Sequence, residues 1–436
     1  MKTIIGDLMN ESIWGRSKRE YPSINKDIEA EILVVGGGIC GILCAYQLSS
    51  RGYSVVLVEK DSIGSHRTFK STAVVTALQD VSYSKLGKSL GKRKAKLYLE
   101  ANLYAVKEFQ KLSEKYSFDY KNVSSYKYSS NKKELEDEMD YILSLGYDAY
   151  LSNISFNMID SWAIEFKNQG QINPVKLIDE LSVNFKIYEH SMITKIKNNY
   201  AYVKKHKIHA KKIIVATGYP FFIWHGGFYM KLSQNKSYVI ALKTNNKSDD
   251  NGIGINNKDL YFTSYKDYLL IGGNDIELGS CCEGFKKLKE YALKNFPDSK
   301  VEKKWVNQDC VSLDGMPYIG RLRFLRDVYV ATGFNLWGMT GAMLSSLIIA
   351  DMICKKENTY SNIFSIYRRM PLIPLIKSIS KSIVGLVQIG GPRCTHMGCK
   401  LKQIGDEFEC SCHGSKYKIN GELIENPAMS DLKRKM

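Results

Sequence analysis

Cysteine and histidine residues gather near the C-terminal end of the sequence. Four of the ten cysteines lie between Cys394 and Cys412. Thiolates and imidazoles are the side chains that bind iron and zinc. The segment Met1–Tyr21 is polar and charged and lacks the apolar stretch of a secretory signal, so a disulfide scaffold is disfavoured. The cysteines therefore predict metal or redox chemistry.

A second pattern with chemical meaning lies near the N-terminal end. Gly36, Gly38 and Gly41 form G-x-G-x-x-G, and Glu59 follows Gly38 by 21 residues. The first glycine of such a motif permits a tight turn, the second lets a pyrophosphate approach the backbone, and the third lets helix and strand pack closely. The helix N-terminus then presents N–H groups to the phosphates, and the carboxylate accepts the ribose hydroxyls. The pattern predicts a dinucleotide site.

The glycine motif alone does not separate FAD from NAD, but five later segments do. In order and spacing they resemble the D-amino-acid-oxidase-like flavoproteins, the class of glycine oxidase and sarcosine oxidase. The resemblance covers roughly residues 30–370, and the segments are Gln171–Pro174, Ile214–Pro220, Trp305–Asp309, Asp314–Gly320 and Val330–Gly341.

This resemblance implies FAD as the cofactor. In the family, the last of these segments forms a glycine turn and helix that face the flavin N1–C2=O edge, where a helix N-terminus stabilises negative charge on the reduced ring. The cofactor-binding residues that it implies are Gly36, Gly38, Gly41, Glu59, Thr72, Ala73, Thr217, Gly218, Gly333, Asn335, Gly338, Met339 and Thr340.

One loop departs from the family pattern. Before Thr72, where the family has small residues, this chain has His66, Arg67, Phe69 and Lys70. These bulky and basic residues leave the substrate pocket undefined, or they supply a cation near the flavin or an acidic substrate. We expect His66 to be a surface histidine rather than a catalytic base. No catalytic residue is assigned; the candidates for the pocket are Lys70, Tyr238 and Arg321.

The C-terminal cysteines and histidines resemble the two boxes of a Rieske protein. The boxes are Cys394-Thr395-His396-Met397-Gly398-Cys399 and Cys410-Ser411-Cys412-His413-Gly414-Ser415. The resemblance implies that Cys394, His396, Cys410 and His413 bind a [2Fe–2S] cluster. It also implies a disulfide between Cys399 and Cys412.

Two alternatives to a cluster remain open. The same four residues could bind zinc. In addition, only one short strand, expected at Ile383–Ile389, precedes the first box, so the base sheet is truncated and the cluster is poorly shielded or absent.

The elements that must position these residues are read from the apolar pattern. Strands are predicted over Glu31–Val35 and Ser54–Val58, with a helix over Ile42–Arg51 between them. Residues 85–150 are expected to be mainly helical, whereas residues 230–275 alternate like an antiparallel sheet. The predicted fold is α/β: a Rossmann-like FAD-binding domain with an inserted α+β substrate domain, plus a small, truncated, all-β Rieske-like module.

The domain boundaries follow from the same pattern. We expect an N-terminal arm at 1–29, the oxidoreductase at 30–370, a linker at 371–391 and the Rieske-like module at 392–436. The nucleotide-binding pieces are expected at about 30–84, 175–229 and 310–370, and the substrate domain at about 85–174 and 230–309.

Charge and hydropathy indicate whether the chain binds nucleic acid or spans a membrane. The chain of 436 residues carries a formal charge of +17. Such an excess can indicate nucleic-acid binding, but the lysines are scattered and no nucleic-acid module is present, so none is expected. The longest apolar run, Met339–Ile353, is broken by Ser345, Ser346 and Asp351 and is too short for a membrane span. We therefore expect a cytoplasmic protein.

The resemblances together imply a function. A small amine or amino-acid-like substrate would give a hydride to the flavin, and the electrons would pass to the Rieske cluster. Three alternatives stay open: a flavoprotein oxidase with a vestigial metal module, an electron-transfer protein that docks another redox protein, and a non-enzymatic redox sensor.

Overall fold

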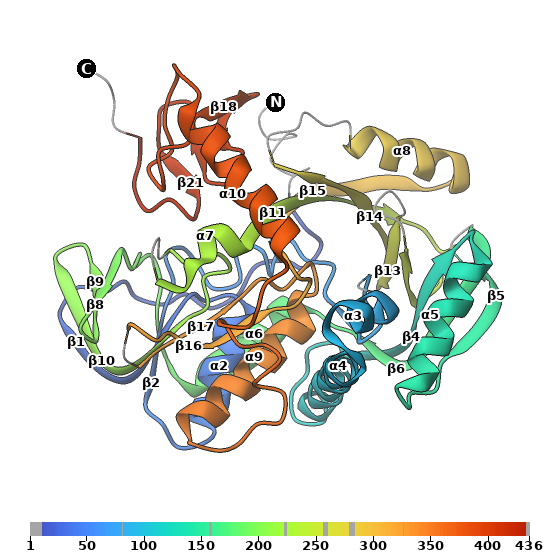
Figure 1. Ribbon diagram of the computed structural model, residues 1–436, viewed down its shortest axis with the longest axis horizontal. Helices are drawn as coiled ribbons and strands as arrows, with labels where there is room; N and C mark the ends of the chain where they lie inside the picture. The colour runs from blue at the N-terminus through green and yellow to red at the C-terminus, as the bar shows by residue number, and fades with distance from the viewer. Residues whose placement is uncertain are drawn as a thin grey trace.

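The computed structural model describes residues 11–80, 82–156, 159–221, 225–255, 260–278, 284–325 and 327–432. Within these residues the chain forms two large sheets with helices packed on them, and a small third sheet near the C-terminus (Figure 1). Among the described residues, no helix is both long and apolar enough to cross a membrane.

The first sheet is built from buried, mostly parallel strands. Its apolar runs, such as the Val-Val-Leu-Val of β2, are typical of a sheet covered on both faces. Three separated parts of the chain contribute strands to it. Its order is β16 (Tyr318–Arg321), β17 (Val328–Thr332), β10 (His206–Val215), β1 (Ile28–Val35), β2 (Val55–Val58) and β7 (Lys186–Tyr188), with β8 (Lys195–Lys197) and β9 (Tyr200–Val203) beside β10.

The second sheet is largely antiparallel and lies over the first. Its order is β15 (Lys300–Ser312), β11 (Leu232–Lys243), β14 (Tyr268–Glu277), β13 (Tyr261–Tyr265), β12 (Asn251–Gly254), β4 (Lys121–Ser129), β6 (Ile159–Gln171) and β3 (Val74–Val75), with β5 (Tyr150–Phe156) on β6. All its strands except β3 fall in the predicted substrate domain.

Helices cover both sheets. The glycine motif opens α2, which packs against α9, and the residues of both helices are almost all buried. The helices are α2 (Ile39–Ser49), α3 (Tyr83–Leu90), α4 (Lys92–Ser113), α5 (Lys132–Ser144), α6 (Pro174–Leu181), α7 (Phe228–Lys231), α8 (Gly284–Asn295), α9 (Gly338–Ile353) and α10 (Leu372–Val387), with short 3-10 turns η1 (Ser182–Asn184) and η2 (His225–Gly227).

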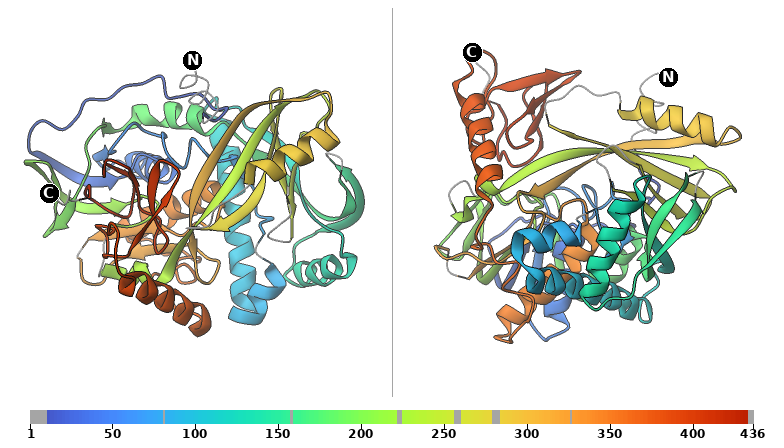
Figure 2. Two further views of the ribbon diagram at one scale, coloured as in Figure 1. Left: turned by 90° about the horizontal axis from the view of Figure 1, so that it is seen from above. Right: turned by 45° about the vertical axis from the view of Figure 1, so that its right-hand side comes forward.

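The third sheet forms a separate small module. It follows α10, and its order is β18 (Leu401–Ile404), β19 (Glu407–Cys410), β20 (Lys416–Lys418) and β21 (Leu423–Glu425). In Figures 1 and 2 the module, drawn in red, stands beside α7 and β11 on one side of the molecule.

The expectation that residues 85–150 are mainly helical misses strand β4. Alternate positions of this strand point inward, but they include Ser125 and Lys127. Lys127 is buried because its Nζ lies 3.5 Å from the carboxylate of Glu138. A strand whose inward positions are polar has no hydrophobic alternation to reveal it.

The strand expected at Ile383–Ile389 is also wrong, because most of this segment belongs to helix α10. A short apolar run cannot by itself separate strand from helix. In the folded chain this segment packs as a helix against the module, and Gly385 is buried against the thiols of Cys412 and Cys399. No described strand precedes Cys394 in the third sheet, so its strands all follow the first box.

Candidate functional site

One large cavity, of about 680 Å³, lies where the two large sheets and the C-terminal module meet. The first strand–helix turn and the loop after β2 line one end of it. The second sheet and the start of α9 line the other end, and residues 423–426 and 428–431 of the module complete the wall. Ten of the thirteen predicted cofactor-binding residues line this cavity, and they are Gly36, Gly38, Glu59, Thr72, Ala73, Thr217, Gly218, Gly333, Gly338 and Met339.

The three glycines of the first turn have different surroundings. Gly36 has a φ of +109°, and a Cβ there would lie 2.7 Å from the carbonyl oxygen of Ala216. A Cβ on Gly41 would clash with the backbone of Gly36. A Cβ on Gly38 would meet only Thr68 within the protein, at 3.3 Å, because this glycine faces the cavity. The first and third glycines therefore serve chain packing, and the second leaves space for a ligand.

Glu59 lies at the same end of the cavity and is held in place by backbone groups. Its Oε2 accepts a hydrogen bond from Gly37 N at 2.6 Å, and its Oε1 accepts one from Asp61 N at 3.0 Å. The N-cap residue of α2, Gly38, has no side chain, and the N–H of Ile39 donates to Thr68 Oγ1 at 3.0 Å, so a neighbouring loop partly caps this helix N-terminus at the cavity. A buried carboxylate beside a helix N-terminus that faces the cavity suits the ribose and pyrophosphate of a dinucleotide.

The turn before α9 forms the other end of the site. Asn335 and Leu336 both have positive φ, at 52° and 71°. A strained Leu is rare, and such strain concentrates at functional sites. Asn335 does not line the cavity; its Nδ2 donates to Gly333 O at 2.8 Å and its Oδ1 accepts from Ser312 N at 2.8 Å, so it holds the turn. The start of α9 has no side-chain cap and faces the cavity, as a reduced flavin requires.

Two other predicted residues also lie behind the cavity wall. Gly41 packs helix against strand, as described above. Thr340 is buried, and its hydroxyl accepts a hydrogen bond from Gln79 at 3.1 Å. Both therefore support the site from the side of α2 and α9 rather than from within the cavity.

Of the three pocket candidates, only Lys70 lines the cavity. Tyr238 packs edge-to-face against Phe285, with ring centroids 5.0 Å apart, in the core between the second sheet and α8. Arg321 is exposed at the end of β16. Both residues lie in strands, and the sequence pattern of a strand does not show which of its two faces points to the cavity.

Charged residues line several walls of the cavity, and the acidic ones are Glu59, Asp61, Asp80, Asp309, Glu425 and Asp431. Among the described lining residues, all the basic ones come from the loop after β2, and they are Lys60, His66, Arg67 and Lys70. Across from this loop the acidic residues are Asp80, whose Oδ1 accepts from Trp337 Nε1 at 2.6 Å, and Asp309, whose carboxylate accepts from Asn307 at 2.9 Å. The wall from the second sheet therefore carries negative charge.

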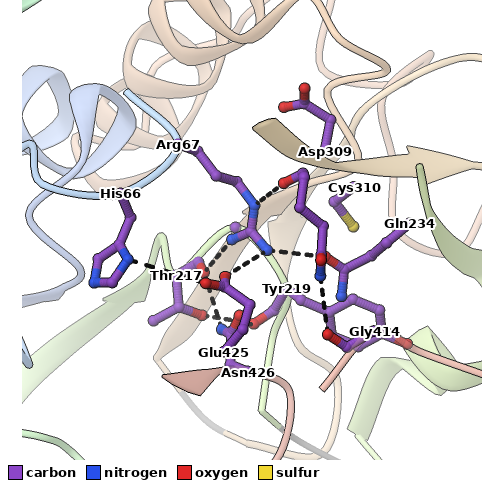
Figure 3. Close-up of polar contacts among 12 residues, drawn as sticks. His66, Arg67, Thr217, Tyr219, Gln234, Asp309, Cys310, Gly414, Glu425 and Asn426 are labelled. Carbon is purple, nitrogen blue, oxygen red and sulfur yellow. Dashed lines mark hydrogen bonds and ion pairs between the residues drawn. The ribbon is translucent and has the colours of Figure 1, made fainter. Parts of the chain in front are cut away.

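Arg67, which departs from the family pattern, joins the oxidoreductase part to the C-terminal module (Figure 3). Its Nε donates to Gln308 O at 2.6 Å and its Nη2 to Gln234 Oε1 at 2.9 Å, and Nη2 also lies 3.2 Å from Glu425 Oε1. Burial alone would raise the pKa of Glu425, but Arg67, His66 and neighbouring lysines hold it at about 2. Because Nη1 also donates to Thr217 O at 3.4 Å, each nitrogen of the guanidinium has a protein acceptor, which argues against Arg67 as a substrate anchor.

Further hydrogen bonds seat the module on the same surface. The side chain of Asn426 donates to Thr217 O at 3.2 Å and to Tyr219 O at 3.1 Å. Gln308 donates to Gly414 O at 2.9 Å, and Gln234 donates to His413 O. The turn that follows β10, at residues 217–219, therefore contacts the module directly.

His66 contacts acidic groups on both sides. Its Nε2 bonds to Asp61 Oδ2 at 2.5 Å, and its Nδ1 lies 4.0 Å from Glu425 Oε2. The ring is about one-third exposed. His66 lines the cavity at the edge of the interface, so the expectation of a surface histidine stays a prediction.

The four predicted cluster ligands lie in one buried region of the module. Cys394, His396, Cys410 and His413 are each at most 6% exposed. The two imidazole rings are perpendicular, with centroids 5.1 Å apart. The Cys394 thiol donates to the Cys410 sulfur, which raises the pKa of Cys394 and lowers that of Cys410.

The surroundings of the two histidines favour their neutral form, which is the form that binds a metal. Burial lowers the pKa of His396 to about 3 and also lowers that of His413. The Nε2 of His413 lies 2.9 Å from Tyr229 O, and because a carbonyl only accepts, this nitrogen must carry the proton. The Nδ1 of His413 and both ring nitrogens of His396 have no hydrogen-bond partner among the described residues. Buried nitrogens without a partner fit a metal centre.

Cys399 and Cys412 lie beside the ligands. Their Sγ atoms and that of Cys410 are within 4.8 Å of one another, and the thiols are free. A bond between Cys399 and Cys412 stays a prediction.

The residues that join the two parts leave no signal in the sequence. Tyr219 is fully buried, and its ring lies edge-on to both ligand histidines, with centroids 6.2 Å from His396 and 6.1 Å from His413. The partners of Arg67 and Asn426 are 150 residues or more away in sequence. Such pairs follow no local spacing, so only the fold reveals them.

Two family models match the chain. The model for FAD dependent oxidoreductases matches residues 31–352, and the model for the Rieske [2Fe-2S] domain matches residues 379–435. The second match begins inside α10, before the boundary at residue 392 expected from sequence.

Individual proteins are similar over most of the chain. YhfW of Bacillus subtilis (strain 168), whose name describes a Rieske 2Fe-2S iron-sulfur protein, is 26% identical, with 97% of each chain covered. Gamma-glutamylputrescine oxidoreductase of Escherichia coli (strain K12) is 21% identical over 76% of this chain and 85% of its own. The crystal structure of glycine oxidase from Geobacillus kaustophilus superposes with a TM-score of 0.67 at 17% identity, over 79% of this chain and 100% of that one.

Proposed function

We propose that this chain, which belongs to the FAD dependent oxidoreductase family and also contains a Rieske [2Fe–2S] domain, oxidises a small amine or amino-acid-like substrate and passes the electrons to its own cluster. The FAD bound by the first domain would accept the electron pair of the substrate, and the cluster bound by the second would take electrons singly. The observation that carries the proposal is that the module lines the same cavity as the predicted cofactor-binding residues.

The charge of the cavity supports an amine. The wall formed by the second sheet carries Asp309, and Asp80 lies at the turn before α3, whereas the described lining residues of that sheet include no basic side chain. An ammonium group is attracted to such a wall, and a carboxylate would need a cation from elsewhere. The names of the similar proteins, glycine oxidase and gamma-glutamylputrescine oxidoreductase, agree with an amine-bearing substrate.

Packing between the two parts supports electron transfer within the chain. Tyr219 lies against both ligand histidines, and it follows Thr217 and Gly218, which line the cavity. The carbonyl of Tyr229 holds the imidazole of His413. Contact through van der Waals packing and hydrogen bonds, without an intervening layer of solvent, favours a short path from the cavity to the cluster.

The test is an anaerobic substrate panel on the intact protein. Small amines and amino acids are added, with hydroxy acids of matched size as the control class. We expect amines to bleach the flavin absorption and the reduced-cluster EPR signal to follow. An Asp309→Asn variant should raise KM for the amines more than it lowers kcat, because it removes charge that attracts the substrate.

Other outcomes would contradict the proposal in distinct ways. A flavin that bleaches while the cluster stays oxidised would indicate an oxidase with a vestigial metal module. Bleaching of the flavin by hydroxy acids alone would contradict the proposal that the substrate is an amine. Two chromophores that respond to no substrate of either class would favour a redox sensor.

A further inference from the structure

Helix α10 turns its apolar side to solvent. Six of its apolar residues are between 53% and 72% exposed, and they are Leu372, Ile373, Ile376, Ile383, Val384 and Val387. At about 100° per residue these six fall within one arc of roughly 120°. Ile389, just beyond the helix, is 90% exposed. Together they form a continuous apolar stripe, which we call the α10 stripe.

The opposite side of the helix, made of small residues, packs against the protein. Gly385 is buried, and a Cβ there would clash with the Sγ of Cys412 and lie 3.4 Å from the Cβ of Cys399. Its carbonyl accepts a hydrogen bond from Lys400 N at 2.9 Å. A surface helix ordinarily buries its apolar stripe and exposes its polar side. In α10 this arrangement is reversed.

The α10 stripe lies at the outer edge of the molecule. In both views of Figure 2 the helix, drawn in orange-red, runs along the periphery, with the red module on one side of it only. Exposed apolar patches of this kind mark an interaction surface. The remaining question is what covers it.

The charge around the stripe favours an anionic surface. From Arg369 to Ile404 the sequence holds six basic residues and no acidic one, and they are Arg369, Lys377, Lys381, Arg393, Lys400 and Lys402. The chain as a whole has 62 basic and 45 acidic residues, so this segment is far more one-sided than the rest. Lys377 borders the stripe on the helix itself.

These features disfavour a second copy of the chain as the partner. A two-fold dimer through α10 would place the same basic segment of each copy opposite its equivalent, and like charges would repel. An anionic lipid surface satisfies both features, because acyl chains take up the apolar stripe and phosphates face the basic residues. We propose that α10 binds the surface of an anionic phospholipid bilayer and lies in the plane of the interface.

Vesicle flotation of the holoprotein tests this at about 0.15 M salt, where long-range charge effects are screened. Vesicles of phosphatidylcholine alone are compared with vesicles containing about one-third phosphatidylglycerol. We expect binding to the anionic vesicles and little to the neutral ones. Lys377→Glu should reduce partitioning by roughly fivefold or more, since each basic residue near such a surface contributes about fivefold.

The apolar contribution is tested with the net charge unchanged. The triple variant Ile376→Ser, Ile383→Ser and Val387→Ser should reduce partitioning at least tenfold. The matched control is Leu293→Ser with Phe324→Ser, two side chains that are 68% and 84% exposed elsewhere on the surface. This control should bind as the wild type does. Retention of both FAD and the cluster absorption in every variant shows that both parts of the chain are folded.

Three results would overturn the proposal. The first is a wild-type protein that does not bind anionic vesicles. The second is a triple variant that binds like the wild type, which would mean that diffuse charge alone is responsible. The third is a lipid-free dimer, detected by sedimentation velocity, that the triple variant dissociates, which would identify a second copy as the partner.

Discussion

The ion pair between Arg67 and Glu425 should hold the module against the cavity, and Glu425→Gln tests this. The variant keeps the shape of the side chain and removes its charge. The pKa of Glu425 falls from an ordinary 4.5 to about 2 in the structure, which corresponds to about 3 kcal/mol at 1.36 kcal/mol per pKa unit. Because the two side chains are 16% and 21% exposed, solvent screening reduces the expected loss of docking free energy to about 2 kcal/mol.

Hydrogen–deuterium exchange measures this loss directly. A loss of about 2 kcal/mol raises the population of the undocked state about 30-fold. Amides in residues 60–70 and 423–430, which face each other at the interface, should exchange faster by up to that factor. The matched control is Glu422→Gln in the same module, whose carboxylate lies 2.9 Å from Lys418 with both side chains more than half exposed. Unchanged exchange in Glu425→Gln, or an equal increase in Glu422→Gln, would refute the reasoning.

The same pair gives docking a pH dependence. The pKa of Glu425 is lower in the docked state than its ordinary 4.5, so its contribution is fully present above about pH 4.5 and is lost as pH falls toward 2. The difference in exchange between wild type and Glu425→Gln should therefore shrink as the solution is acidified through this range. A difference that stays constant would assign the protection to other contacts.

Three further predictions concern the two cofactor sites. Gly38→Val should abolish FAD retention with little loss of protein stability, because its side chain would enter the cavity where it meets only Thr68; a purified variant with wild-type flavin content would contradict this. Tyr417→Phe should lower the reduction potential of the cluster by about 60 mV. The Tyr417 hydroxyl lies 3.4 Å from the sulfur of Cys394, and a hydrogen bond to a charged group contributes about 1.4 kcal/mol. An unchanged potential in a redox titration would exclude this bond. Gly385→Ala should destabilise the module by about 1–3 kcal/mol, because the added methyl group overpacks the contact with the thiols. The cluster absorption should then be lost at a lower temperature while FAD stays bound. Equal stability would show that α10 can move away from the module.

The sequence predicts those parts of the sites whose chemistry depends on short spacing. Gly36, Gly38 and Gly41 act through one turn, so their offsets alone indicate a strand, a turn and a helix. The two cysteine–histidine boxes likewise place ligands within a few residues of each other, and the family models agree with both assignments. Apolar runs also predict the three separate pieces of the first sheet, because buried parallel strands are apolar throughout.

Tertiary structure alone decided how the two parts meet. Arg67 looks in sequence like a cation for the flavin or substrate, but in the fold its guanidinium bonds to Gln308, Gln234 and Glu425. Tyr219 gains its place between cavity and module only because β10 brings it there. The orientation of α10 is a third case: periodicity reports that one side of a helix is apolar, but whether that side faces the core depends on packing. Contacts between distant residues leave no periodic trace in a sequence, since the free energy that selects them belongs to the folded arrangement as a whole.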